Sequence, residues 1–134
     1  MRKPILLISL FLMVILFISM TVKWSDQSEP WAVPAKYEKM KNAFATTPDN
    51  DNIGRILYKK HCNSCHGIKG LGDGKKSAKI KAPMPDFSSA EFKAQTDGAM
   101  YYKTYIGRDE MPAFKNKISD KEDQWLLINY IKNM

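Results

Sequence analysis

The sequence predicts a small all-α domain at the carboxyl-terminal end, preceded by one hydrophobic helix. Two stretches, 98–106 and 119–134, carry apolar residues at helical spacing, bounded by capping residues or glycine. No alternation of strand and helix patterns is seen along the chain. Nineteen residues from Pro4 to Val22 carry no charge, which predicts the hydrophobic helix. We therefore expect an all-α fold with about three main helices.

The most informative motif is Cys62-Asn63-Ser64-Cys65-His66. C-x-x-C-H is the attachment signature of c-type haem. Two thiols on one helical turn can each add across a haem vinyl group, and the following histidine is then placed under the iron as an axial ligand. The motif predicts one covalent haem c, attached through Cys62 and Cys65, with His66 as a metal ligand.

Other interpretations of the motif have less support. A structural zinc site needs four ligands at separated spacings, but the two Cys and two His of this chain all lie within 61–66. A thioredoxin-like C-x-x-C needs a βαβ context, which is lacking. A plain disulfide or a chance match is the remaining alternative.

The amino-terminal segment 1–24 is predicted to be a membrane anchor. The uncharged run is close to the length of about 20 residues that crosses a bilayer, whereas a signal-peptide core has about 7–15. No Ala-x-Ala cleavage pattern occurs between Ile15 and Ser28. We expect an uncleaved anchor; a removed signal peptide is the alternative.

The charges around this segment predict its orientation. Arg2 and Lys3 favour a cytoplasmic amino terminus, Lys23 opposes that orientation, and Trp24 suits the far interface. The rest of the chain then lies outside the cytoplasm. We expect a single-pass protein of the inner membrane with its haem domain on the periplasmic side.

Composition excludes some partners. The chain has 21 basic and 14 acidic residues; without Arg2, Lys3 and Lys23 the basic residues fall to 18, about +4 before haem. The lysines are interspersed with acids and no nucleic-acid-binding motif is present, so we expect no nucleic-acid partner. Both cysteines are assigned to haem, which leaves no disulfide framework.

Residues 25–51 are expected to form a tether, and 52–134 the haem domain. The tether contains three prolines and ends in Thr-Thr-Pro-Asp-Asn-Asp, a run predicted not to sustain regular structure. Tyr37, Met40 and Phe44 fall on one helical face, which indicates either a short helix lying on the haem domain or a partly ordered linker. A domain of about 83 residues buries little of its own surface, so a haem would complete its core.

The first and second helices are predicted from capping signals. The first covers about 52–62 with Asp51 as a candidate cap. The second covers about 98–106, with Asp97 as N-cap and Gly107 as its stop.

The third helix runs to the chain end. Ser119 and Glu122 have capping-box spacing, and an apolar face follows from Trp125. Residues 67–96 are expected to be mainly loop around the haem, with a turn of helix at 90–95.

These features resemble the small class I cytochromes c over residues 52–134. In that family a glycine and an aromatic residue on the first helix cross a leucine and an aromatic residue on the last. The matching positions here are Gly54, Tyr58, Leu127 and Tyr130. The resemblance implies a distal methionine in a loop before the last helix, often followed by proline, which Met111-Pro112 fits.

The tether, with Pro30-Trp31-x-Val33-Pro34-Ala35, is similar to that of membrane-anchored bacterial monohaem members of the family. In the family a proline carbonyl holds the proximal histidine. Pro83 and Pro85 compete for that role here.

Elimination among the methionines also favours Met111 as the second metal ligand. Met100 lies inside the second helix, where methionine is usually a core residue, and Met40 lies in the tether. Met84, between two prolines, could approach the iron. Met111 is in a loop far enough from His66 to reach the opposite face. Met84, an open iron or a lysine ligand are the alternatives.

Several nearby residues have two interpretations. His61 is expected to be an exposed helix residue. Trp125 is either core or a donor to a haem propionate, and Arg108 either pairs with a propionate or is solvated. The tyrosines at 101, 102 and 105 are expected to be haem-wall and core residues.

The loop after the motif is rich in lysine, and its basic side chains are Lys69, Lys75, Lys76, Lys79 and Lys81. A basic rim of the haem pocket would steer redox proteins with acidic docking surfaces; a solvated loop without a dedicated partner is the alternative.

Function follows from ligation. With His66 and Met111 on the iron, no coordination position is open, so we expect no catalytic residues and no enzyme activity. The sequence predicts a monohaem one-electron carrier in an extracytoplasmic respiratory chain, between a quinol-oxidising complex and a terminal oxidase or reductase. The alternatives are a fixed haem c subunit of a larger complex and, with less support, an open-site haem enzyme or gas sensor.

Overall fold

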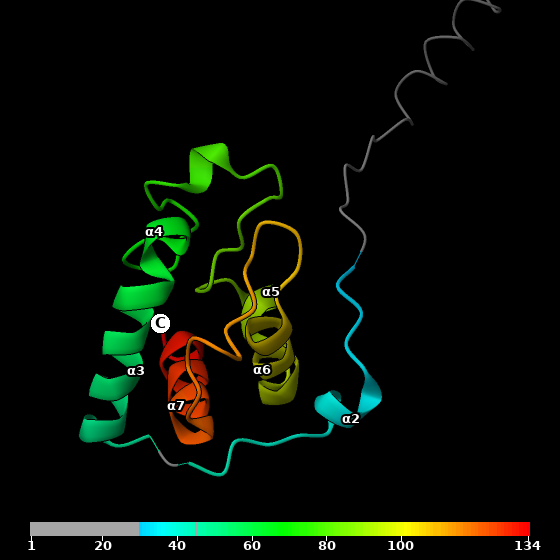
Figure 1. The fold of residues 1–134 in the computed structure, drawn as a ribbon, viewed down its shortest axis with the longest axis vertical. Helices are drawn as coiled ribbons and strands as arrows, with labels where there is room; N and C mark the ends of the chain where they lie inside the picture. The colour runs from blue at the N-terminus through cyan, green and yellow to red at the C-terminus, as the bar shows by residue number, and fades with distance from the viewer. Residues whose placement is uncertain (1–29, 45) are drawn as a thin grey trace, which may run out of the picture. The chain divides into compact units, whose positions relative to one another are not determined.

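The computed structural model describes residues 30–44 and 46–134, and within them the fold is all-helical (Figure 1). The predicted anchor at 1–24 lies outside the described residues. Among the described residues, no helix has the length and apolar character needed to cross a bilayer. Residues Trp31–Met134 form one compact unit. Its helices are α2 (Ala35–Glu38), α3 (Pro48–His61), α4 (Asn63–His66), the 3-10 helix η1 (Ser77–Lys79), α5 (Ala90–Lys93), α6 (Asp97–Ile106) and α7 (Lys121–Lys132).

The three main helices are α3, α6 and α7, as the sequence predicts. α7 packs against both α3 and α6, and Figure 1 shows α7 next to α3. Its buried face includes Leu126, Leu127 and Ile128, each no more than 1% exposed. α7 is therefore the element that the rest of the domain is built around.

The crossing of α3 and α7 confirms the arrangement that the resemblance implied. A Cβ atom added at Gly54 would lie 2.5 Å from the carbonyl oxygen of Leu126 and 2.7 Å from the Cβ of Tyr130. The rings of Tyr58 and Tyr130 meet with centroids 5.5 Å apart, and Tyr58 packs in one cluster with Leu127. The missing side chain at Gly54 thus lets the two backbones approach closely.

The core has two clusters of buried side chains. One lies between α3 and α7 and extends to Phe87, Phe114 and Ile118 in the loops. The other lies between α6 and α7, where Tyr101 stacks on Trp125 with ring centroids 4.3 Å apart. The two clusters share α7, whose apolar residues face both neighbouring helices.

The predicted start of the first helix was wrong by four residues. α3 begins at Pro48, and the side chain of Thr47 caps it by accepting a hydrogen bond from the amide of Asn50 at 3.2 Å. Proline suits the first helical position because its ring fixes φ and no amide is needed there. The Thr-Thr-Pro-Asp-Asn-Asp run therefore opens the helix, and Asp51 lies inside its first turn.

Two predicted caps were also displaced by one residue. α6 is capped by Thr96 rather than Asp97, and Gly107, with φ 71°, ends it as predicted. α7 is capped by Asp120, which accepts from the amides of residues 122 and 123, so the predicted capping box at Ser119 was wrong. In each case a neighbouring polar side chain has the extended backbone that a cap needs.

Residues 31–44, here called the strap, run along the domain ahead of α3. α2 within the strap packs on α6. Tyr37, Met40 and Phe44 contact the cluster between α6 and α7. Of the two interpretations of this segment, the structure favours the one in which it lies on the domain, although its helix is only one turn long.

The segment 67–96 is mainly loop, as predicted, with η1 and α5 as its helical turns. Backbone hydrogen bonds fix it to α4, from Lys76 N–H to Ser64 O at 2.8 Å and from Gly74 N–H to Cys65 O at 3.2 Å, and one from Phe87 N–H to Gly70 O at 2.8 Å closes the loop on itself. This loop therefore forms a wall beside the end of α3 and α4.

Candidate haem-binding site

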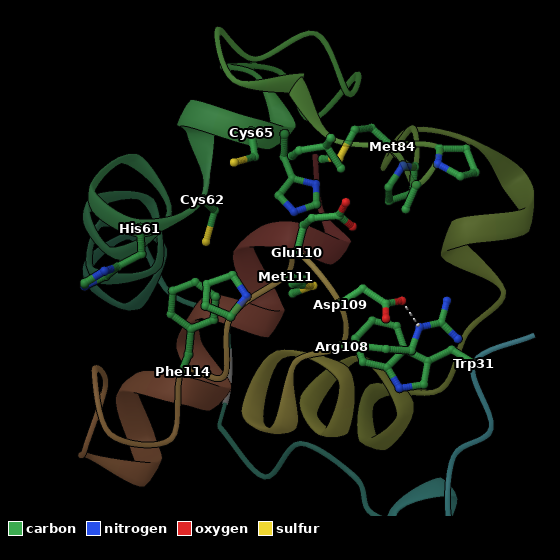
Figure 2. A pocket seen from close by; sticks show the side chains of 16 residues that line it. Trp31, His61, Cys62, Cys65, Met84, Arg108, Asp109, Glu110, Met111 and Phe114 are labelled. Atoms are coloured by element: carbon green, nitrogen blue, oxygen red, sulfur yellow. Dashed lines mark ion pairs between the residues drawn. The ribbon is translucent and has the colours of Figure 1, made fainter. Parts of the chain in front are cut away.

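Two adjoining cavities lie where α4, the 67–96 loop and the loop after α6 meet. They contain about 770 and 520 Å³ that no protein atom occupies, part of it open to solvent. Both are lined by Trp31, Cys62, His66 and Met111. Cys65 and Met84 line the larger one, which Figure 2 shows. The structure thus places all four predicted site residues around one space.

Cys62 and Cys65 lie at the junction of α3 and α4, and neither forms a disulfide. Cys62 is the C-cap of α3 and the N-cap of α4, so the chain changes helix axis between the two thiols. Burial, with a smaller contribution from Cys65, raises the pKa of the Cys62 thiol to about 12. Two free thiols that line a common cavity are what two thioether bonds to a haem require.

His66 is the last residue of α4 and is half-buried. Burial lowers its imidazole pKa to about 4, so the ring is neutral at physiological pH. Its Nδ1 is buried without a hydrogen-bond partner among the described residues. The ring packs on Phe87, with centroids 4.7 Å apart. A neutral imidazole is the form that binds a metal.

The backbone around His66 is fixed on both sides. The hydroxyl of buried Tyr58 donates to the carbonyl oxygen of Gly67 at 2.6 Å. The carbonyl oxygen of His66 accepts from the amide of Gly72 at 2.9 Å. These bonds connect the histidine to α3 and to the loop, which limits the ways in which its ring can move.

Met111 is held by a tight turn. Arg108 and Met111 exchange both backbone hydrogen bonds at 2.9 Å, with Asp109 at a φ of 52° between them. The amide of Phe114 donates to the carbonyl of Thr104 at 3.1 Å, which ties the loop to α6. The methionine backbone is therefore fixed although the segment is irregular.

Two other methionines lie near the cavities. Met84 lines the larger cavity together with Pro83 and Pro85. Met100 is buried in α6, as predicted for a core residue, and also lines the smaller cavity. Met111 alone of the three lines both cavities. The Nδ1 of His66 has no hydrogen-bond partner among the described residues, so the structure assigns the supporting role to neither Pro83 nor Pro85.

Sequence reasoning missed two residues of the site. Trp31 was placed in the tether, yet it lines both cavities. Phe87 is 5% exposed, packs on His66 and Tyr58, and lines the smaller cavity. Both come from irregular segments, where no periodic pattern marks a buried side. The spacing Pro-Trp-x-x-Pro was the only local signal for Trp31.

The residues with two interpretations are now placed. His61 is half-buried and lines the larger cavity beside Phe114, at a centroid distance of 5.9 Å, so the expectation of an exposed helix residue was wrong. Trp125 is core, 3% exposed and stacked on Tyr101. Arg108 lines the larger cavity and pairs with Asp109 at 3.4 Å.

The residues present fit a covalent haem c. The cavity walls are mostly apolar, two thiols face the cavity at the C-x-x-C spacing, and a neutral imidazole has one buried ring nitrogen without a partner among the described residues. A thioether lies in the same cavity. Imidazole and thioether together are an axial ligand set that haem iron accepts.

Comparison with known proteins agrees with this site. Residues 52–134 match the family Cytochrome c. No curated protein matches the chain significantly. Proteins of this family are typically electron carriers rather than enzymes, and the Cys62 and Cys65 spacing is consistent with covalent haem c. On this match, which covers more than half of the sequence, the chain belongs to the cytochrome c family, whose domain implies haem-based electron transfer.

Proposed function

We propose that this protein is a membrane-anchored monohaem carrier that passes single electrons between partners of an extracytoplasmic respiratory chain. The observation that carries the proposal is the meeting of Cys62, Cys65, His66 and Met111 at one cavity. The haem, when bound, supplies the one-electron redox couple.

Each site residue has a distinct role in this proposal. Cys62 and Cys65 attach the cofactor by thioether bonds. His66 holds the iron from the α4 side, where Tyr58 and Gly72 fix the neighbouring backbone. Met111 holds it from the turn after α6, and its thioether favours the reduced state relative to a second histidine. If His66 and Met111 both bound the iron, no coordination position would be left for a substrate, which favours a carrier over an enzyme.

The basic side chains near the site support an acidic partner. A third cavity shares His61, Cys65 and Glu110 with the larger haem cavity. It is also lined by four lysines, namely Lys60, Lys76, Lys79 and Lys117. Lys76 and Lys79 belong to the loop predicted to form a basic rim. A rim of positive charge beside the haem cavities would speed encounter with a partner that has an acidic docking surface. Salt would screen this attraction.

The membrane location rests on segment 1–24. Its uncharged run and its lack of a cleavage pattern support an uncleaved anchor in the inner membrane, with the haem domain in the periplasm. Protein matured in a haem-attaching host is expected to remain in membranes after alkaline carbonate washing and to begin near Met1. Soluble protein that begins near Val22–Ser28 would show a cleaved signal instead.

The test of function compares Met111→Ala with Met84→Ala. Both residues line the larger cavity, so each substitution is a control for the other. Met111→Ala is expected to keep one covalent haem that survives acid–acetone extraction, to lose the weak Met–iron absorption band of the oxidised protein, to lower the potential and to bind carbon monoxide. Met84→Ala is expected to keep the parent spectrum and potential.

The opposite pattern of results in the two variants would identify Met84 as the iron ligand. Avid carbon monoxide binding by the parent protein would contradict the carrier proposal, because it would show an accessible coordination position. Haem released by acid–acetone would contradict covalent attachment through Cys62 and Cys65.

A further inference from the structure

The strap is fixed to α7 by a network of amide side chains. The Nδ2 of Asn42 donates to the carbonyl oxygen of Trp125 at 3.0 Å and to Oδ1 of Asn129 at 2.8 Å. In return, Nδ2 of Asn129 donates to the carbonyl oxygen of Phe44 at 3.0 Å. These contacts join residues more than 80 positions apart in the sequence. They are the bonds of a docked segment, not of a free linker.

The strap also lies directly on α6. A Cβ atom at Gly98 would come within 1.8 Å of the carbonyl oxygen of Tyr37, so only glycine leaves room for the strap backbone. The hydroxyl of Thr96 donates to the Glu38 carboxylate at 2.8 Å. The Tyr37 ring meets Tyr102 with centroids 4.7 Å apart. The path of the strap is therefore determined at both α6 and α7.

This docking brings Trp31 to the haem site. Trp31 is half-buried and lines both haem cavities. The Arg108 guanidinium lies over its ring, 4.7 Å from the centroid, and the Lys103 ammonium lies at 6.0 Å. Arg108 is also the first residue of the turn that carries Met111. One aromatic ring thus contacts both the cavity and the support of the distal ligand.

We propose that Trp31 is a positioning residue of the haem site, which covers one edge of the haem and holds Arg108 beside the Met111 turn. The proposal rests on the proposed function, because it assumes that haem fills the two cavities. It assigns to the strap a role in setting the reduction potential that is separate from any role in tethering.

Solvent exposure and nearby charge both affect the reduction potential of a haem. An apolar wall at the cavity excludes water, and lower solvent exposure of a haem disfavours the more highly charged oxidised state. A guanidinium held beside the site disfavours the oxidised state further. Removing the indole admits water and releases Arg108 from the ring, so both effects lower the potential. The ligand turn also loses one of its supports.

The experiment uses the full-length haem-loaded protein and four single variants. Trp31→Ala removes the wall, and Trp31→Phe keeps an aromatic ring. Gly98→Ala pushes the strap away from α6 at a residue that itself lines neither haem cavity. Lys36→Ala changes an exposed strap residue and is the matched control. The readouts are the reduction potential, the Met–iron band and the rate of proteolytic cleavage within 31–44.

Trp31→Ala is expected to lower the potential while haem stays attached, and Trp31→Phe to recover most of that shift. Gly98→Ala is expected to shift the potential in the same direction and to speed cleavage of the strap. The double variant Trp31→Ala/Gly98→Ala is expected to shift the potential by less than the sum of the two single shifts. The reason is that both substitutions act by removing the same ring from the same cavity. Lys36→Ala is expected to match the parent.

A Trp31→Ala protein with the parent potential, or additive shifts in the double variant, would overturn the proposal. Equal shifts in Trp31→Ala and Lys36→Ala would also overturn it, because they would show a general effect of altering the strap. The parent spectrum separates this failure from failure of the proposed function. A parent without the Met–iron band contradicts the function, whereas a parent with the band and an inert Trp31→Ala contradicts only the role of Trp31.

Discussion

Gly54→Ala tests the helix crossing on which the domain is built. Two effects of opposite sign compete at this position. Alanine is the better helix former, by about 1 kcal/mol. Against that, the new Cβ would lie 2.5 Å from a carbonyl oxygen of α7 and 2.7 Å from the Cβ of Tyr130. Neither atom is the end of a flexible side chain, so relief requires the two helices to move apart.

The expected net effect follows from these magnitudes. Overpacking in a well-packed core costs about 1–3 kcal/mol, and here the clash involves backbone, which places it toward the upper end. Subtracting the gain in helix propensity leaves a destabilisation of about 1–2 kcal/mol. For a domain of this size that corresponds to a melting temperature lower by roughly 4–16 °C.

The assay is thermal and urea unfolding of the haem-loaded protein, followed by far-UV circular dichroism. Lys59→Ala is the control, because Lys59 is exposed on the same helix and its replacement changes helix propensity little. It is expected to match the parent closely. A Gly54→Ala protein as stable as the parent, or more stable, would refute the reasoning, because it would show that propensity outweighs the clash and that the helices are farther apart.

Two further predictions concern hydrogen bonds. Tyr58→Phe leaves the Gly67 carbonyl without its partner and is expected to lower the unfolding free energy by about 1–3 kcal/mol in urea titrations. Burial, followed by nearby Cys62, raises the pKa of Tyr58. The contribution of the Tyr58 hydroxyl to the unfolding free energy is therefore complete below about pH 10 and is lost as pH rises through the raised pKa. The stability difference between the parent and Tyr58→Phe should be constant up to about pH 10 and shrink above it. A difference that grows above that pH would contradict this sign. Asp120→Ala removes a helix cap and is expected to lower the free energy of unfolding by about 1 kcal/mol. Ser119→Ala is expected to change that free energy by less than about 0.5 kcal/mol. Equal effects of the two substitutions would contradict the assignment of Asp120 as the cap.

The parts of the fold that the sequence predicted are those with local signals. The long helices have apolar side chains at regular spacing, and the C-x-x-C-H spacing assigns its own chemistry within five residues. Helix starts were less accurate, because Thr47, Asp51 and other polar residues all favour the first turn, and only the backbone shows which one caps the helix. Capping at Asp120 rather than Ser119 is the same kind of ambiguity.

The wall of the site was not predictable by these means. Trp31 meets Arg108 across 77 positions of sequence, and neither residue lies in a periodic segment. Phe87 lies in an irregular loop, where burial on His66 is decided by tertiary packing. Met111 was predicted as a ligand because a methionine before proline in a loop is a local feature. Local pattern thus indicated the ligand candidates but not what surrounds them.

The docking of residues 31–44 bears on how this chain can be shortened or recombined. Cutting at the family boundary, residue 52, would uncover the faces of Met100, Tyr101, Trp125 and Ile128 that the strap contacts. Exposed apolar surface of that kind promotes self-association. A chain that begins at residue 30 or 31 would keep this surface covered. For exchange of the preceding residues with another segment, the usable junction therefore lies before Trp31, some twenty residues ahead of the point where the match to the family begins.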